Sequence, residues 1–452
     1  MRTHIVHRGA GELTYEIRNI VRVAEKLQRL GMTIIAENIG DPVTKGEAVP
    51  GWIKEIVAEL AMDDCTYGYC PTQGVLETRE FLAERTNRLG GVQITPEDIV
   101  FFNGLGEAIS KVYGFLRSTA RVMTPSPTYT THSSAEASHA GLSPVSYPLN
   151  PRNRWYPDLD ELYRRVKYNP SVAGILIVNP DNPTGAVYPE SIIREIVGIA
   201  KEFDLFLIAD EIYQNLIYNG QETLSLAEVV EEVPGISMKG ISKEFPWPGA
   251  RCGWIEVYNR EKDTRFASYV QSIMNAKMME VCSTTLPQKA IPRILRHPAY
   301  PDYLEARKRR YEAFSNIALD KFADIPGVLA NRPNGAFYMS VAFEEGMLNG
   351  DQTLPIPDAS ARTFVEGLTS AEGIQPDKRL VYYLLGSTGV CVVPLSSFNS
   401  KLQGFRLTLL EPDEGRFTRM VETLANGVKD YLLAPRLENE HAGPGLVSRA
   451  GR

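Results

Sequence analysis

Two periodicities of apolar residues run along the chain, and together they predict alternating helices and buried strands. Between residues 12 and 30, apolar side chains recur every three or four positions, which predicts an amphipathic helix that Gly31 ends. Glu107 is expected to open another helix. The same period predicts helices over residues 52–62, 75–89, 155–167 (beginning near Pro157-Asp158), 189–203, 300–321 and 416–433, with residues 263–320 largely helical.

Short unbroken apolar runs predict strands that a parallel sheet buries on both faces. Such runs occupy residues 99–102, 175–178 and 205–210, and shorter candidates occupy residues 121–124 and 238–242. Predicted helices separate most of these runs. Strand, helix and strand in this order form βαβ units, so the sequence predicts an α/β fold with a mainly parallel central sheet.

The pattern changes from about residue 323, where short strands replace the alternating units. Residues 324–343 are expected to form two strands around a tight Asn334-Gly335 turn. Further strands are expected over residues 389–398 and 404–411, which indicates a smaller α+β domain joined by a strand near residues 32–40. We therefore expect an N-terminal arm with the first part of the small domain, a large α/β domain, the rest of the small domain and a flexible tail, at residues 1–62, 63–320, 321–436 and 437–452.

The composition excludes several classes of protein. Of the 452 residues, 43% are hydrophobic, and 48 basic against 55 acidic residues give a net charge of −7, which argues against a nucleic-acid partner. No run approaches the roughly 18 apolar residues of a membrane span, and the first residues lack the apolar core of a signal peptide. The scattered cysteines favour buried, reduced thiols in a cytoplasmic protein over a disulfide framework or a metal site: Cys65, Cys70, Cys252, Cys282 and Cys391.

Two stretches carry candidate chemistry. In residues 237–254, Lys243 could bind an aldehyde cofactor as a Schiff base and Arg251 could bind that cofactor's phosphate, although most Ser-Lys pairs are solvated surface. After the predicted strand 99–102, a glycine turn leads to the helix start at Leu105 and Gly106. Free backbone N–H groups and the helix dipole make such a turn an anion cradle, although an ordinary βα turn has the same pattern.

Polar residues follow the predicted strands of the α/β domain. Asn182, Asp210 and Lys243 each come at or shortly after the end of a strand, and ligands of parallel sheets bind outside these carboxyl ends. Tyr129 follows the strand at residues 121–124, where it either stacks on a flat ring or only packs. The sequence therefore predicts one ligand site at this edge of the sheet.

The order of these motifs resembles the class I and II aminotransferases, the fold-type-I enzymes that depend on pyridoxal phosphate. NPDNPTG at 179–185, ADEIY 209–213 and SK followed by Arg251 occur in the family's order, and the resemblance covers residues 12–433. The chain is most similar to the alanine (glutamate–pyruvate) branch. The stretches that carry this likeness are NIGDP, GYC with GVLETR, NGLGEAI, NPDNPTGAVY, GISK and RPNGAFYM.

The resemblance implies a role for each matching residue. Lys243 would form the Schiff base and then move a proton between the substrate Cα and the cofactor C4′. Asp210 would keep the ring nitrogen protonated, so that the ring withdraws electrons. Asn182 and Tyr213 would hydrogen-bond the phenolic oxygen, and Tyr129 would stack on the ring. The phosphate would be bound by Leu105, Gly106, Ser242 and Arg251, together with Tyr69 reaching from the partner subunit of a homodimer.

The substrate residues implied by the resemblance come from three segments. Arg406 would bind the α-carboxylate through its planar guanidinium, with a surface salt bridge as the alternative. Gly40 of NIGDP, together with Asn182, would also line the substrate site. In TYEIR, Tyr15 and Arg18 would contact the side-chain end of glutamate, with packing on a helix surface as the alternative.

Three features depart from the family pattern. Gly240 replaces a phosphate-binding serine, Leu395 stands where glycine is common, and a rigid PWPG stretch lies between Lys243 and Arg251. The segment KMMEVCSTT at 277–285 has no arginine, which argues against an aspartate-specific enzyme.

The function implied is transamination between an L-amino acid and a 2-oxo acid, with alanine/pyruvate and glutamate/2-oxoglutarate as the leading pair. Alternatives are an aminotransferase for an aromatic, branched-chain or specialised biosynthetic amino acid, and a lyase or synthase on the same scaffold. A non-catalytic ligand sensor is a third alternative, but no helix-turn-helix extension is visible in the sequence.

Overall fold

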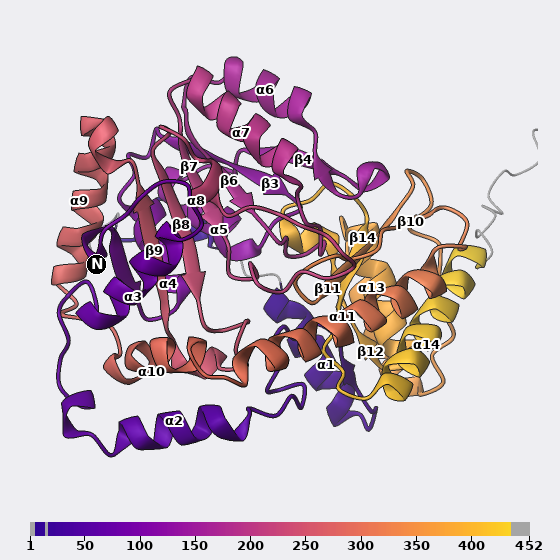
Figure 1. Ribbon diagram of the computed structural model, residues 1–452. Helices are drawn as coiled ribbons and strands as arrows, with labels where there is room; N and C mark the ends of the chain where they lie inside the picture. The colour runs from indigo at the N-terminus through magenta and orange to yellow at the C-terminus, as the bar shows by residue number, and fades with distance from the viewer. Residues whose placement is uncertain (1–4, 14–16, 435–452) are drawn as a thin grey trace, which may run out of the picture.

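The computed structural model describes residues 5–13 and 17–434. These residues form two regions, one built on a large β-sheet and one on smaller sheets (Figure 1). The large sheet has eight strands, and the small region holds a four-stranded sheet and a two-stranded one. Figure 1 shows helices packed around the large sheet, with the small region to its right. The predicted arrangement of a mainly parallel sheet beside a smaller α+β region is confirmed.

The large sheet has the strand order β2-β9-β8-β7-β6-β3-β4-β5. Neighbouring strands from β8 through β7, β6 and β3 to β4 pair in parallel, whereas β9 is antiparallel to both β8 and β2. The strands are β2 (Ile99–Phe102), β3 (Arg121–Ser126), β4 (Ser146–Asn150), β5 (Tyr156–Pro157), β6 (Val172–Val178), β7 (Phe206–Asp210), β8 (Gly235–Gly240) and β9 (Gly253–Tyr258).

Two hydrophobic clusters cover the two faces of this sheet, which explains the unbroken apolar runs. On β6, Ile175 and Ile177 belong to one cluster, and the alternate residues Leu176 and Val178 belong to the other. Helices supply the rest of both layers: α3 (Leu76–Asn87), α4 (Leu105–Gly114), α5 (Thr130–Ala140), α6 (Leu159–Lys167), α7 (Glu190–Glu202), α8 (Leu226–Val229) and α9 (Thr264–Met278).

The small region combines residues from both ends of the chain. Strand β1 (Ile35–Ala36) pairs in parallel with β12 (Val390–Cys391), so the expected strand near residues 32–40 does join this region. The antiparallel sheet contains β10 (Val328–Ala330), β11 (Tyr338–Phe343), β14 (Gly404–Thr408) and β13 (Val393–Pro394). Its helices include α1 (Ile17–Arg29), α11 (Tyr300–Phe322), α12 (Ala359–Thr369), α13 (Pro376–Thr388) and α14 (Glu414–Leu433).

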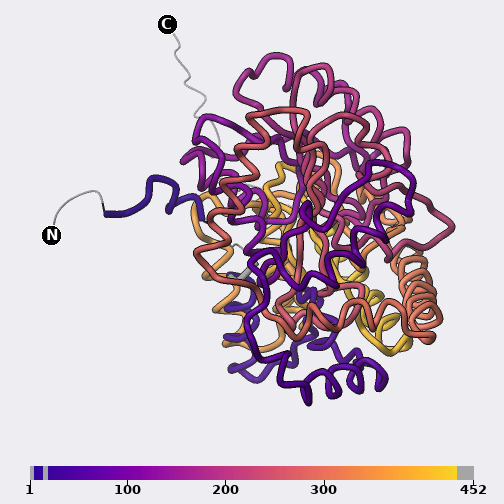
Figure 2. The backbone as a smooth tube through the Cα atoms, turned by 60° about the vertical axis from the view of Figure 1, so that its left-hand side comes forward, coloured from indigo at the N-terminus to yellow at the C-terminus, as the bar shows by residue number. Residues whose placement is uncertain are grey.

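Two further helices lie along one end of the molecule. Figures 1 and 2 show α2 (Gly51–Ala61) and α10 (Thr285–Leu295) side by side below the large sheet. Among the described helices, none has a stretch long and apolar enough to span a bilayer.

The expected Asn334-Gly335 hairpin turn is wrong. Strands β10 and β11 are antiparallel neighbours, but seven residues, 331–337, connect them instead of two. Within this connection the amides of Asn334 and Gly335 donate to the Gly185 carbonyl, and the Asn334 carbonyl accepts from the Tyr218 amide. The Asn-Gly pair therefore joins the small region to the large one, and tertiary hydrogen bonds decide its conformation.

Other expectations need smaller corrections. Helix α4 begins at Leu105 rather than Glu107, and α6 begins at Leu159, where the Asp158 side chain caps it. Cys252 and Cys391 are buried as expected, but Cys65 is exposed, and Cys70 and Cys282 are only half-buried. The predicted tail at residues 437–452 lies outside the described residues.

A buried charge cluster links three neighbouring strands of the large sheet. The Lys239 amine on β8 lies 2.9 Å from Glu256 on β9 and 3.6 Å from Glu211, which follows β7. Burial raises the pKa of Glu211 above its ordinary value. Burial acts in the same direction at Glu256, but the positive charge of Lys239 outweighs it, so the pKa of Glu256 is below its ordinary value. The Glu256 carboxylate also accepts from the Thr86 and Tyr258 hydroxyls, and among the described ion pairs Lys239 is the one cation of this cluster.

Replacing this cation should destabilise the fold strongly. Lys239→Met leaves two buried carboxylates without their cation, and breaking a buried pair costs about 3–5 kcal/mol of unfolding free energy. Lys201→Met is the matched control, because its pair with Glu231 is exposed and the change costs below about 0.5 kcal/mol. Urea denaturation of both variants measures these values. Equal stability of the two variants would contradict the prediction.

Candidate active site

The carboxyl ends of the parallel strands deliver the predicted residues to one edge of the large sheet. Asp210 ends β7, Asn182 follows β6, Tyr129 follows β3 and Lys243 follows β8. Because β3, β6, β7 and β8 are all parallel, these four residues meet at the same edge. The predicted convergence is therefore present in the structure.

Asp210 is a buried carboxylate with a histidine as its partner. It is 3% exposed, and its Oδ2 lies 3.0 Å from His132 Nε2, while Oδ1 accepts from the Ile212 amide. The other His132 nitrogen lies 3.5 Å from the Tyr113 hydroxyl, whose pKa is raised by burial. This pairing fixes the orientation of the carboxylate and provides a buried anion at the sheet edge.

His132 was missed by the sequence analysis. It lies in α5, three residues after Tyr129, and the two rings make an edge contact at 6.2 Å between centroids. Tyr129 is the N-cap residue of α5, so its short distance in sequence from His132 is the signal that the sequence contained. The partnership with Asp210 is not visible in the sequence, because 78 residues separate the two.

The amine of Lys243 is held by the N-terminal segment. Its Nζ donates to the Gly40 carbonyl at 2.7 Å and lies 5.7 Å from the centre of the Phe337 ring. A Cβ added to Gly40 would lie 2.2 Å from the Tyr338 hydroxyl oxygen, so only glycine lets this backbone approach. Gly40 therefore lies beside the lysine, and its role in lining the substrate site stays a prediction.

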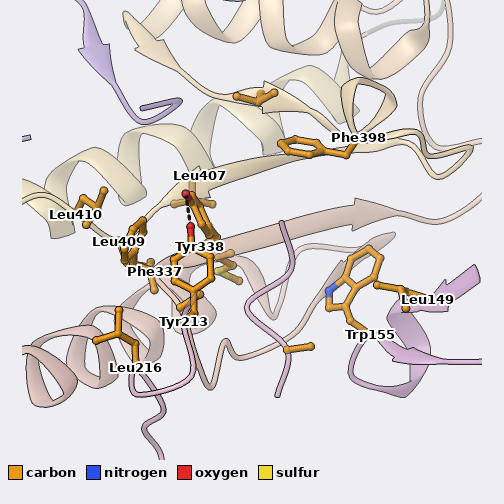
Figure 3. Packing of buried hydrophobic residues seen from close by; sticks show 14 of the residues in the cluster. Leu149, Trp155, Tyr213, Leu216, Phe337, Tyr338, Phe398, Leu407, Leu409 and Leu410 are labelled. Carbon is orange, nitrogen blue, oxygen red and sulfur yellow. Dashed lines mark hydrogen bonds between the residues drawn. The ribbon is translucent and has the colours of Figure 1, made fainter. Parts of the chain in front are cut away.

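Two tyrosine hydroxyls meet next to this lysine. The Tyr213 hydroxyl donates to that of Tyr338 at 3.0 Å, and Figure 3 shows the two side chains facing each other with Phe337 beside them. Burial and the neighbouring Tyr338 raise the pKa of Tyr213. The Tyr213 hydroxyl therefore remains protonated at neutral pH and can donate a hydrogen bond. The sequence analysis selected Tyr213 but not Tyr338, whose strand comes from the small region.

An anion cradle is present where β2 leads into α4. Leu105 and Gly106 are the first residues of α4, so their amides have no acceptor within the helix. Gly104 has a φ of +86°, and a Cβ there would lie 2.3 Å from Arg251 Nη2. The guanidinium therefore covers the turn, and the exposed Arg251 and Gly106 leave the cradle open to a phosphate.

Arg406 is buried between the two sheet regions rather than lying in a surface salt bridge. Its side chain, 4% exposed, donates to the Asn38 carbonyl at 2.7 Å and to Asn182 Oδ1 at 3.3 Å. The rings of Tyr338 and Phe398 lie 4.5 Å and 4.9 Å from the guanidinium carbon. This geometry presents a fixed cation at the edge occupied by Asn182.

Packing explains two of the departures from the family pattern. A Cβ at Gly240 would lie 3.1 Å from the Cys252 carbonyl oxygen and 3.1 Å from Ile212 Cδ1, so a serine there would be crowded. Leu395 is buried, and its Cδ1 would lie 2.7 Å from a Cβ added to Gly404. Leu395 therefore fills the space above a glycine of β14.

Several predicted residues are not brought into this cluster. Tyr69 is 87% exposed, which is compatible with contact to another subunit. Ser242 is half-buried beside Lys243. Tyr15 lies outside the described residues, and Arg18 belongs to α1 but its side chain is not described. The roles expected for these four residues therefore remain predictions.

A further carboxylate lies buried inside the loop between Asn179 and Asn182. Asp181 is fully buried, and its Oδ2 accepts from the amide and the hydroxyl of Thr184. Within the described part of the chain, its Oδ1 has no hydrogen-bond partner. Burial raises the pKa of Asp181 from its ordinary value to about 7, and the nearby Asp210 carboxylate adds to this effect.

Comparisons with known proteins agree with this geometry. The family model for aminotransferase class I and II matches residues 37–424. An uncharacterized aminotransferase of Methanocaldococcus jannaschii is 59% identical over 432 residues, which cover 96% of this chain and 100% of that protein. The glutamate-pyruvate aminotransferase AlaA of Escherichia coli is 32% identical over 329 residues, covering 72% of this chain and 79% of that protein.

The structural comparison gives the same result. The solved structure of an alanine aminotransferase from Pyrococcus furiosus is similar at a TM-score of 0.79 and 27% identity. The match covers 95% of this chain and 99% of that one. The predicted fold-type-I class is therefore confirmed.

Asp181 should make stability depend on pH near neutrality. Its pKa of about 7 in the folded state exceeds the ordinary 3.8, so the folded protein retains a proton that the unfolded chain loses between about pH 4 and 7. The folded state therefore loses stability as pH rises through this window. Asp181→Asn cannot ionise, and its carbonyl can still accept from Thr184, so the variant should avoid this loss.

Urea denaturation at pH 5 and pH 8 measures this effect. From pH 5 to pH 8, the unfolding free energy of Asp181→Asn should increase relative to that of the wild type, by an amount on the order of a few kcal/mol. The exposed Asp160→Asn variant is the control and should show no such gain. A difference between wild type and Asp181→Asn that does not change with pH would refute the prediction.

Proposed function

The chain belongs to the class I and II aminotransferases, and we propose that it transfers an amino group between L-alanine and 2-oxoglutarate with pyridoxal 5′-phosphate as cofactor. The proposal rests on one observation. The Lys243 amine, the Asp210–His132 pair and the Arg406 guanidinium lie at the same edge of the large sheet. An amine, a buried carboxylate and a fixed guanidinium are the three groups that an amino-group transfer from an α-amino acid requires.

The residues present fit pyridoxal phosphate at both of its ends. The Gly104 turn, the free amides of Leu105 and Gly106 and the Arg251 guanidinium would hold the phosphate. Asp210, oriented by His132, would accept a hydrogen bond from the ring nitrogen. Asn182 and Tyr213 would bind the phenolic oxygen, Tyr129 would stack on the ring, and Ser242 would add a phosphate contact.

When bound, the cofactor supplies an electron sink for the pair of electrons left when the substrate loses its Cα proton. The Lys243 amine would accept this proton from the substrate Cα and deliver it to C4′ of the cofactor. Arg406 would hold the α-carboxylate with two parallel hydrogen bonds, which orients the Cα–H bond toward Lys243. The Phe337, Tyr338 and Phe398 rings around these groups limit the access of water.

The choice of alanine and glutamate rests on two observations. Proteins named alanine or glutamate-pyruvate aminotransferases are among the relatives and the similar structures. In the segment 277–285, the only cation is Lys277, which is buried and paired with Glu107 at 3.1 Å and Glu280 at 2.8 Å. Its charge is therefore neutralised within the chain, which disfavours a role in binding the second carboxylate of aspartate.

A homodimer is part of this proposal. The side chains of Tyr67, Tyr69, Met279 and Val281 are exposed, and a hydrogen bond from the Thr285 hydroxyl to the Gly68 carbonyl links the two segments that carry them. Large exposed apolar side chains on linked segments favour contact with a second protein surface. The partner subunit's Tyr69 would then reach the phosphate cradle, and light scattering that reveals an active monomer would refute this part of the proposal.

A half-reaction screen tests the proposed substrates. Purified protein loaded with cofactor is mixed with single L-amino acids, and the absorbance of the bound cofactor is followed as it converts to its pyridoxamine form. Alanine and glutamate should convert the cofactor rapidly, and pyruvate and 2-oxoglutarate should reverse the change. Lys243→Ala should abolish both directions, because it removes the amine that moves the proton, whereas Lys201→Met should not alter them.

The same screen separates the alternatives. Conversion by an aromatic or branched-chain amino acid, with no response to alanine or glutamate, would overturn the proposed substrates but leave the reaction type unchanged. Release of ammonia together with a 2-oxo acid, without amino transfer to 2-oxoglutarate, would identify a lyase.

A further inference from the structure

A buried arginine of helix α11, Arg307, binds the main chain at Lys243. Arg307 opens the sequence RKRR, a basic run that would ordinarily be solvated on a charged helix. In the structure, Arg307 is 3% exposed, and its Nη1 donates to the carbonyls of Lys243 at 2.9 Å and Glu244 at 2.6 Å. A single guanidinium group therefore fixes the backbone at the position where the lysine side chain begins.

The same guanidinium is paired with a buried carboxylate from the N-terminal segment. Arg307 Nε lies 2.6 Å from Glu47 Oε1, and Arg310 Nη2 donates to Glu47 Oε2 at 2.6 Å. The Tyr303 and Tyr311 hydroxyls also donate to this carboxylate. Burial alone would raise the pKa of Glu47, but the two arginines together lower this pKa by more than burial raises it. The pKa is therefore below its ordinary value, and the carboxylate stays charged.

Glu47 ends a segment that holds the far end of the same lysine. We call residues 36–47 the anchor segment. In its middle, the Gly40 carbonyl accepts from Lys243 Nζ at 2.7 Å. At its beginning, the buried Glu37 pairs with Lys45 at 2.6 Å and accepts from the Thr408 hydroxyl at 2.5 Å. The Glu37–Lys45 pair closes the anchor segment on itself, while Thr408 at Glu37 and the arginines at Glu47 join its two ends to the rest of the protein.

We propose that Arg307 is a positioning residue that fixes the Lys243 amine, directly through the lysine main chain and indirectly through Glu47 and the anchor segment. This inference rests on the proposed function of Lys243 as the group that moves the Cα proton. A lysine side chain has four rotatable bonds, so its amine is located only if both the backbone and the amine have fixed partners. Arg307 contributes to both.

The substrate-binding arginine meets the anchor segment at the end away from Glu47. Arg406 donates to Asn182 and to the carbonyl of Asn38, which follows Glu37, and neither Arg307 nor Glu47 is a partner in its described hydrogen bonds. Loss of Arg307 should therefore change how well the amine is placed more than how well the amino acid binds. This separates a positioning role from general damage to the site.

The test uses a variant pair that separates stability from position. Arg307→Met leaves Glu47 buried with a weaker set of partners. The double variant Arg307→Met/Glu47→Leu replaces the whole pair with apolar side chains, which often restores the stability lost by breaking a buried ion pair. Because Arg310 is 24% exposed on its side chain, its charge can reach water in the double variant.

Arg79→Met is the matched control. Arg79 is also buried, and it also binds two main-chain carbonyls and a carboxylate, those of Gly74, Pro96 and Glu97. It has no contact with Lys243 or with the anchor segment among the described hydrogen bonds and ion pairs. Any effect common to losing a buried, carbonyl-binding arginine should therefore appear in this variant too.

Two measurements are made on each variant. In cofactor-loaded enzyme, the double variant should lower kcat by about 10- to 100-fold, with KM for alanine changed less than kcat. In cofactor-free protein, a short pulse of acetic anhydride followed by mass spectrometry reports the reactivity of Lys243 relative to Lys201. Lys243 should be labelled several-fold faster in both Arg307 variants than in the wild type and in Arg79→Met.

The outcomes decide between the two roles. If the double variant regains the wild-type unfolding free energy together with wild-type kcat and labelling, Arg307 is only structural and the proposal is wrong. Recovered stability with low kcat and fast labelling supports it. If the wild type transfers no amino group, the proposed function fails on its own, and the labelling of cofactor-free protein still decides whether Arg307 fixes the amine.

Discussion

Parallel pairing of β3, β6, β7 and β8 is the constraint on which this enzyme depends. Neighbouring strands that run in one direction must end at one edge, so residues far apart in sequence arrive together where their strands pair. Asp210 and Lys243 are placed in this way. The apolar layers on both faces keep the edge rigid, and a rigid edge is what a site with several separate binding groups needs.

The second constraint is that charges buried between the large and small regions must have partners. Arg406 binds Asn38 and Asn182, Lys243 binds the Gly40 carbonyl, and Glu47 binds two arginines. An unpartnered charge at any of these positions would cost several kcal/mol. The interactions that make the site chemically useful are therefore the same ones that join the two regions.

Much of the fold could be predicted because its signals are local. The apolar run at 99–102 corresponds to β2, and the stripe in residues 12–30 corresponds to α1. The order of strands and polar residues along the chain also predicted that Lys243, Asp210 and Asn182 lie at one edge of the sheet. The Asn334-Gly335 turn was wrong because its amides bind Gly185, a partner that local propensity does not include.

The sequence by itself determined the layers of the sheet, the edge at which chemistry occurs and the residue types that meet there. It could do so because apolar periodicity and motif order are properties of the chain itself. Only the tertiary structure decided which side chains hold those residues in place. His132 behind Asp210, Tyr338 beside Tyr213 and Arg307 behind Lys243 all come from distant segments. A hydrogen bond between such segments leaves no periodic signal, because its geometry exists only after the layers have packed.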